Sequence, residues 1–94
     1  MEFINHPKGT ISNYTGNLSF QIVASESKQE HSAPVLHTSE GLVRLYIKGD
    51  NPFENSQLRP FEGQHIQVEG KWKNGILVVK SDQLVVVQSP SNEE

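Results

Sequence analysis

The dipeptide Asn74-Gly75 lies between two runs of alternating apolar and polar residues. Both central positions of a type I′ turn need a positive φ angle, which Asn-Gly tolerates, so this dipeptide predicts a tight β-hairpin. One face of the run before the turn is apolar apart from one glycine: Ile66, Val68, Gly70 and Trp72. The run after the turn, residues 76–80, forms the returning strand. A period of two predicts half-buried strands packed on a core.

Further segments of the same kind predict five or six short strands in total. The apolar faces are Leu18, Phe20, Ile22 and Ala24 in one segment, and Val43, Leu45 and Ile47 in another. Short apolar runs at 34–37 and 84–87 add to these, and Ser81-Asp82 interrupts the chain before the last run. Around Gly16 the sequence allows either a turn or a glycine bend inside one long, coiled strand. Residues 25–32 are polar throughout and predict an exposed loop.

One short helix is predicted between the third and fourth main strands. Asn51 is a good N-cap, Pro52 suits the first helical position, and Glu54 follows three residues after the cap. Pro60 would end this helix, which places it over about 52–59. The apolar side chains available to close one end of a barrel are Phe53, Leu58 and Phe61.

The length of 94 residues fits one domain, which we expect to span residues 1–88, with a disordered polar tail at 89–94. The chain has no cysteine, which excludes disulfides, thiolate metal sites and a cysteine nucleophile. It shows no signal-peptide pattern and no apolar run near the roughly 18 residues that span a bilayer. We therefore expect a cytoplasmic protein with no membrane partner, although removal of a leader peptide would leave the same sequence.

The strand pattern, the glycine-containing first strand and the segment PFEGQHIQVEG, residues 60–70, resemble the OB-fold. Domains of that family often enter the fourth strand with a glycine ahead of a β-branched alternation, which Gly63, Ile66 and Val68 match here, and a hairpin follows. The resemblance implies an all-β fold, a small closed five- to six-stranded OB-like barrel with a ligand face across its second and third strands. An SH3-like barrel is the alternative topology. Because OB-fold domains bind single-stranded nucleic acid, oligosaccharide or protein, the fold alone does not choose a ligand.

Charge is unevenly distributed along the chain. The net charge of −3 is not typical of a strongly basic nucleic-acid binder, yet residues 41–80 carry six basic against four acidic residues. Alternation places Arg44, Tyr46 and Lys48 on the outward face of the third strand, where a ring between two cations suits stacked bases and phosphates. Glu69 lies on the same strand face as the hairpin lysines and opposes an anionic ligand. The complete predicted ligand-binding set is Gln21, Arg44, Tyr46, Lys48, Lys71 and Lys73.

The sequence contains no recognisable catalytic motif. The four histidines lack metal-ligand spacing, and no nucleophile elbow, Walker loop or dinucleotide-binding glycine pattern is present. We therefore expect no metal, no cofactor and no enzymatic activity, since a barrel of this size is filled by its own side chains. A small enzyme would need a pocket with convergent acid and base groups.

The sequence predicts a non-enzymatic OB-like module that contacts single-stranded nucleic acid. The alternative is a protein-interaction or assembly module, including self-association, with no nucleic-acid ligand. The alternative rests on the segment Leu84–Val87, which is apolar on both faces although a terminal strand normally has one face in solvent.

Overall fold

The computed structural model describes residues 2–24, 30–50 and 56–87, and its fold is all-β, as predicted. Its elements are β1 (Ile11–Ala24), β2 (Glu30–Thr38), β3 (Gly41–Ile47), the 3-10 turn η1 (Arg59–Phe61), β4 (His65–Lys73) and β5 (Ile76–Val86).

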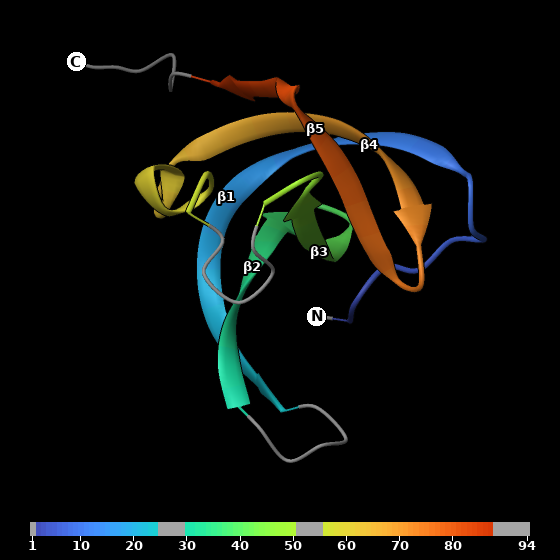
Figure 1. The fold of residues 1–94 in the computed structure, drawn as a ribbon, viewed down its shortest axis with the longest axis horizontal. Coiled ribbons are helices and arrows are strands. Elements are labelled where there is room, and N and C mark those ends of the chain that lie inside the picture. The colour runs from blue at the N-terminus through green and yellow to red at the C-terminus, as the bar shows by residue number, and fades with distance from the viewer. Residues whose placement is uncertain (1, 25–29, 51–55, 88–94) are drawn as a thin grey trace.

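The five strands pair in the order β1-β2-β3-β5-β4, and β4 pairs back to β1, so the sheet closes on itself (Figure 1). β3 and β5 run parallel, while the other neighbours are antiparallel. The first strand supplies this closure because it has two partners: residues 11–17 pair with β4, and residues 16–24 pair with β2.

Gly16 lies where β1 passes from one partner to the other. A Cβ atom at this position would lie 2.1 Å from the carbonyl oxygen of His37, which is backbone and cannot turn aside. Glycine is therefore required by the close approach of two strands. Of the two alternatives that the sequence allowed, the bend inside one long strand is confirmed.

The core fills the barrel with side chains from every strand. Trp72 is fully buried, as its strand face predicted, and its indole N–H donates to the Ser12 hydroxyl at 3.1 Å. Tyr14 meets Trp72 edge to face, with ring centroids 6.2 Å apart. Burying the indole while satisfying its polar atom gains apolar contact without leaving an unpaired donor. The fully or nearly fully buried cluster is Leu18, Leu36, Val43, Leu45, Ile47, Leu58, Ile66, Val68, Trp72, Leu77 and Val79.

The helix predicted over about 52–59 is wrong within the described residues. Residues 51–55, including the predicted N-cap, lie outside the described part, residues 56–58 form a turn, and the only helical element described is η1. Pro60 is one of the first residues of η1 rather than a terminator, because the first turn of a helix does not use its missing N–H. Leu58 nevertheless closes the barrel end as predicted, with Phe61 packed beside the core.

The polar loop predicted for residues 25–32 is wrong for its last three residues. Residues 30–32 belong to β2 and pair with residues 22–24 of β1, because an antiparallel hairpin extends its hydrogen bonds whatever the polarity of its side chains. Residues 25–29 lie outside the described part of the chain, as do residues 89–94 of the predicted tail.

An irregularity separates β5 into two parts. Gly70 of β4 is opposite Val79, whereas Val68 is opposite Leu84, so β5 holds extra residues between these two pairs. This β-bulge contains Ser81 and Asp82, where the sequence interrupts its apolar run.

Candidate ligand-binding face

The register of β3, β5 and β4 brings most of the predicted ligand-binding residues together. Arg44 lies opposite Ile76, which lies opposite Lys73. One row along, Tyr46 lies opposite Val78, which lies opposite Lys71. Since neighbouring side chains in one row of a sheet point to the same side, both rows lie on the outside of the barrel.

Lys48 and a residue outside the predicted set, Lys80, extend this surface. The Lys48 amide donates to the Val79 carbonyl at 2.9 Å, which continues the parallel pairing by one residue and places Lys48 beside Lys80. Lys80 keeps the outward parity of Ile76 and Val78, so the alternation of its own strand could have identified it.

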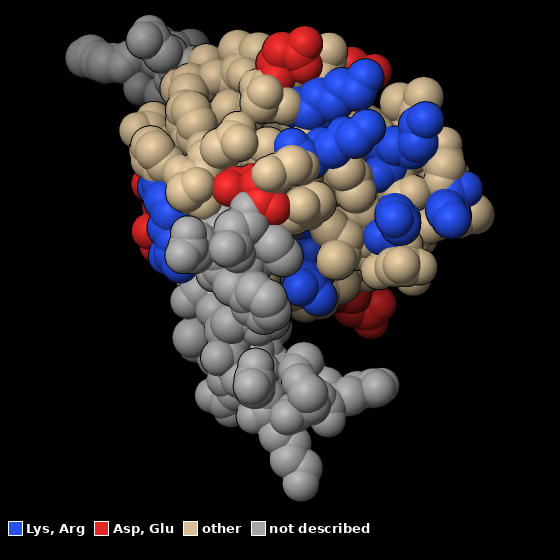
Figure 2. Space-filling view, in the orientation of Figure 1, with Lys and Arg blue, Asp and Glu red and all other residues tan. Residues whose placement is uncertain are grey.

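We use the name basic face for the surface formed by Arg44, Tyr46, Lys48, Lys71, Lys73, Ile76, Val78 and Lys80. It carries five of the eight lysine and arginine residues of a protein whose net charge is −3. Figure 2 shows Lys and Arg side chains gathered over the part of the molecule where β4 and β5 cross the front of the view. The lysines are exposed, while Arg44 and Tyr46 are half-buried.

Tyr46 is held in place at the centre of the basic face. Its hydroxyl donates to the backbone carbonyl of Asp50 at 2.7 Å. Asp50 is largely buried, and its carboxylate accepts hydrogen bonds from the Ser56 hydroxyl and the Gln57 backbone N–H, each at 3.0 Å. The hydroxyl of Tyr46 therefore anchors the segment that follows β3, and the ring is positioned by that anchor.

Gln21 is not brought onto the basic face. It lies on β1 opposite Ala33, and its side-chain amide is 3.1 Å from the Nε2 atom of His37. The Ser19 hydroxyl is 2.7 Å from the same ring nitrogen. A hydroxyl beside an imidazole is part of a nucleophile–base pair, but here the Gln21 amide occupies the nitrogen that a base would use. Ser19, Gln21 and His37 therefore form a polar cluster on β1 and β2, separate from the basic face.

Part of the outer side of β2 is covered where a ligand face across the second and third strands would lie. Val35 is opposite both Ser19 and Arg44, which point outward, yet Val35 is 0% exposed, and Ala33 is 2% exposed. Other parts of the chain therefore cover Ala33 and Val35, whereas His37 on the same face of β2 is exposed. The open, cationic surface lies on the other side of β3, over β5 and β4.

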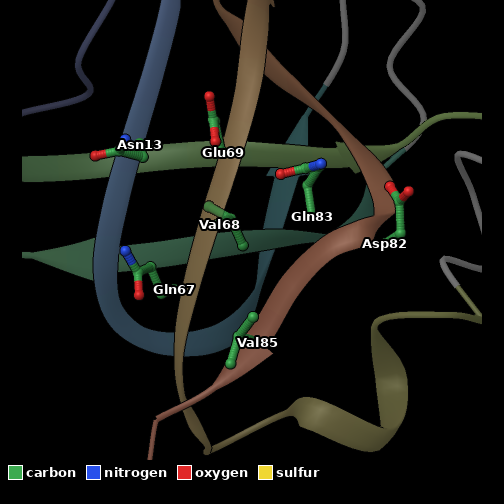
Figure 3. A pocket seen from close by; sticks show the side chains of 7 residues that line it. All are labelled: Asn13, Gln67, Val68, Glu69, Asp82, Gln83 and Val85. Atoms are coloured by element: carbon green, nitrogen blue, oxygen red, sulfur yellow. The ribbon is translucent and has the colours of Figure 1, made fainter.

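A shallow hollow lies next to the basic face but differs from it in charge. It is lined by Asn13, Gln67, Val68, Glu69, Asp82, Gln83 and Val85, contributed by β1, β4 and β5 (Figure 3). Its two ionisable lining groups, Glu69 and Asp82, are both acidic, so it repels the anions that the basic face attracts. No group of three or more His, Asp or Glu side chains in the described parts of the chain is placed to hold a metal ion.

Comparison of the chain with protein-family models, with curated proteins and with solved structures found no match. Within residues 2–24, 30–50 and 56–87, no helix has the length and apolar character required to cross a membrane.

Proposed function

We propose that this chain is a non-enzymatic, OB-like binding module that contacts single-stranded nucleic acid through its basic face. The expected ring of five strands, with a long first strand bent at a glycine and shared between two neighbours, supports the OB-like assignment. The ligand-binding residues are Arg44, Tyr46, Lys48, Lys71, Lys73 and Lys80, and Gln21 is left out of the set.

The clustering of cations around one aromatic ring carries the proposal. Nucleic-acid grooves combine cations that follow the phosphates with rings on which bases stack. Tyr46 lies between Arg44, on the same strand, and Lys48, which follows that strand directly. In the row across the sheet, Val78 separates Tyr46 from Lys71. A protein with a negative net charge gains nothing for solubility by collecting its cations on one face, which favours an anionic ligand.

A single strand fits this face better than a duplex does. The half-buried side chains of Tyr46, Ile76 and Val78 offer an aromatic and apolar strip between the cations. Unpaired bases can stack on such a strip, whereas a duplex keeps its bases stacked inside. No helix on this face is available to enter a major groove, since all its residues come from β3, the residue that follows β3, β4 and β5.

Fluorescence anisotropy of labelled single-stranded DNA and RNA tests the proposal directly. If the five cations each contact a phosphate, the affinity falls by about 10³-fold between about 20 mM and 150 mM salt, from a slope of about 0.7 per contact. Lys71→Gln and Lys73→Gln should each reduce the slope of log Kd against log salt by about 0.7. Arg59→Gln is the charge-matched control, because the Arg59 guanidinium packs over the Phe20 ring, 4.3 Å from its centroid, away from the basic face.

A pair of variants separates the ring of Tyr46 from its hydroxyl. Tyr46→Phe removes the bond to the Asp50 carbonyl but keeps the ring, so binding should stay within twofold of wild type. Tyr46→Ala removes the ring and should weaken binding by the roughly 1–3 kcal/mol of one stacked base. Equal losses in both variants would mean that Tyr46 acts only through its anchor, and no binding at low salt would reject the nucleic-acid ligand altogether.

A further inference from the structure

The two halves of β5 have different neighbours. Residues Ile76–Val79 lie between β4 and β3, whereas Leu84–Val86 pair with β4 alone. On the side of β5 that faces β3, the last described hydrogen bond is the one that the Lys48 backbone N–H donates to the Val79 carbonyl. Within the described residues, the second half of β5 is therefore a sheet edge.

The alternation of hydrogen-bonded and non-hydrogen-bonded pairs between β4 and β5 shows which backbone groups point out from this edge. The Val87 amide donates to the His65 carbonyl at 2.7 Å, so these two residues form a hydrogen-bonded pair. Such pairs alternate along an antiparallel ladder, which makes Val85 and Gln67 the next one. The N–H and C=O groups of Leu84 and Val86 consequently point away from β4.

The side chains at this edge offer little protection against pairing with another strand. Val85 is 58% exposed and Val86 is 39% exposed. Residues 83–87, QLVVV, contain neither charge nor proline, the two devices that usually keep an edge strand from pairing. Exposed valines beside backbone groups that have no partner among the described residues are typical of a strand that receives a partner.

We infer that a second copy of this chain pairs with the edge of β5, antiparallel and centred on Val85. In this register Leu84 of each copy lies opposite Val86 of the other, and the outward N–H and C=O groups of both residues bond twice across a two-fold axis. The two Val85 side chains become a non-hydrogen-bonded pair, the arrangement with the closest side-chain contact.

The edge is complementary to a second copy of itself in this register. Keeping the outer face of one sheet continuous with the outer face of the other requires odd-numbered residues to lie opposite odd-numbered residues. Centring on Val85 satisfies this rule and pairs Gln83 with Val87, so no charge of the described segment meets a like charge. The pairing involves about five residues per chain, below the size of a standard stable interface, so the dimer is weak and depends on concentration.

Sedimentation equilibrium tests this inference without reference to nucleic acid. The apparent mass should rise from the 10.5 kDa of one chain towards twice that value as the concentration increases from about 10 µM to about 1 mM. Val85→Lys should keep the protein monomeric over the whole range, because a lysine on an edge blocks pairing. Ile11→Lys is the matched control: Ile11 is 63% exposed on a strand but lies on β1 opposite Lys71, outside the edge formed by residues 84–86, so this variant should still dimerise.

A second variant tests whether the dimer needs the backbone hydrogen bonds of the edge as well as the Val85 side chain. Val86→Pro removes an amide that points away from β4, so the barrel keeps its ladder while the edge loses a donor. This variant should also be monomeric, with an unchanged fluorescence spectrum of the single tryptophan. A wild-type protein that stays monomeric up to about 1 mM would overturn the inference, and so would self-association that persists in both edge variants.

Discussion

Two glycines allow the strands of this barrel to approach more closely than any other residue would permit. A Cβ atom at Gly16 would lie 2.1 Å from the His37 carbonyl oxygen, and one at Gly70 would lie 2.4 Å from the Val78 carbonyl oxygen. Neither glycine has a positive φ angle, so the requirement is space rather than backbone conformation. Both occur where strands change partner or register.

We expect Gly16→Ala to destabilise the protein by about 1–3 kcal/mol or more, because a methyl group forced into a filled space displaces backbone. The exposed neighbour Thr15 provides the control, since Thr15→Ala should change the free energy of unfolding by no more than about 0.5 kcal/mol. Urea unfolding followed by the fluorescence of buried Trp72 measures both variants. Equal stabilities would show that the strands can separate at this point without cost.

Asp50 and Leu58 position the described residues between β3 and η1, which are 48–50 and 56–58. Asp50 accepts two hydrogen bonds from residues six and seven positions further along the chain. Leu58 is fully buried in the core although it belongs to no strand. Closing the end of the barrel therefore depends on side chains outside the sheet.

Asp50→Ala should lower the free energy of unfolding by about 1–3 kcal/mol, because it leaves the backbone N–H of Gln57 without its acceptor in a part-buried site. Ser56→Ala removes only the exposed hydroxyl that donates to the same carboxylate, and should cost about 0.5 kcal/mol. Thermal unfolding measured by circular dichroism gives the difference. A larger loss for Ser56→Ala than for Asp50→Ala would contradict the anchoring role of the carboxylate.

The strands could be predicted from the sequence wherever one face is buried, because burial enforces a period of two. The segments around Leu18, Leu45 and Val68 follow this rule. The helix could not be predicted correctly, since the capping signals at 51–54 describe only a local preference. Leu58 packs into the barrel, and Ser56 and Gln57 donate hydrogen bonds to Asp50. These contacts hold residues 56–58, and η1 begins only after them. Tertiary contacts of this kind have no local signature.

The molecule as a whole separates its charges. Its basic face adjoins the hollow lined by Glu69 and Asp82, while the net charge is −3. This separation orients an approaching anion towards β3 and β5.

We expect Glu69→Gln to strengthen binding of single-stranded nucleic acid by about two- to threefold at low salt. A phosphate of the ligand and the Glu69 carboxylate would repel each other by about 0.6 kcal/mol if they were about 7 Å apart in water. The substitution removes this repulsion. Glu62→Gln removes the same charge just after η1 and should leave the affinity unchanged. Anisotropy titrations of the two variants compare them. Equal gains in both would mean that only net charge matters and that no face is preferred.

The candidate site was only partly predictable from the sequence. Parity along each strand correctly assigned the outward side chains of Arg44, Tyr46, Lys71 and Lys73. Parity could also have marked Lys80 as outward-facing, but it could not reveal that β3 and β5 are neighbours, which is what places Lys80 beside Lys48. Parallel pairing of distant segments depends on the closure of the sheet. For the same reason, the alternation along β1 predicted that Gln21 points outward but could not show that β2 separates it from β3.

The most direct test is to map the contact surface by ¹⁵N NMR while a short oligothymidine is added at low salt. We predict that amide shifts concentrate at residues 44–48, 71–73 and 76–80, which form the basic face, and that residues around Gln21 stay unchanged. Shifts confined to β1 and β2, shifts centred on the acidic hollow, or no shifts at all would contradict the assignment of the basic face as the ligand-binding surface.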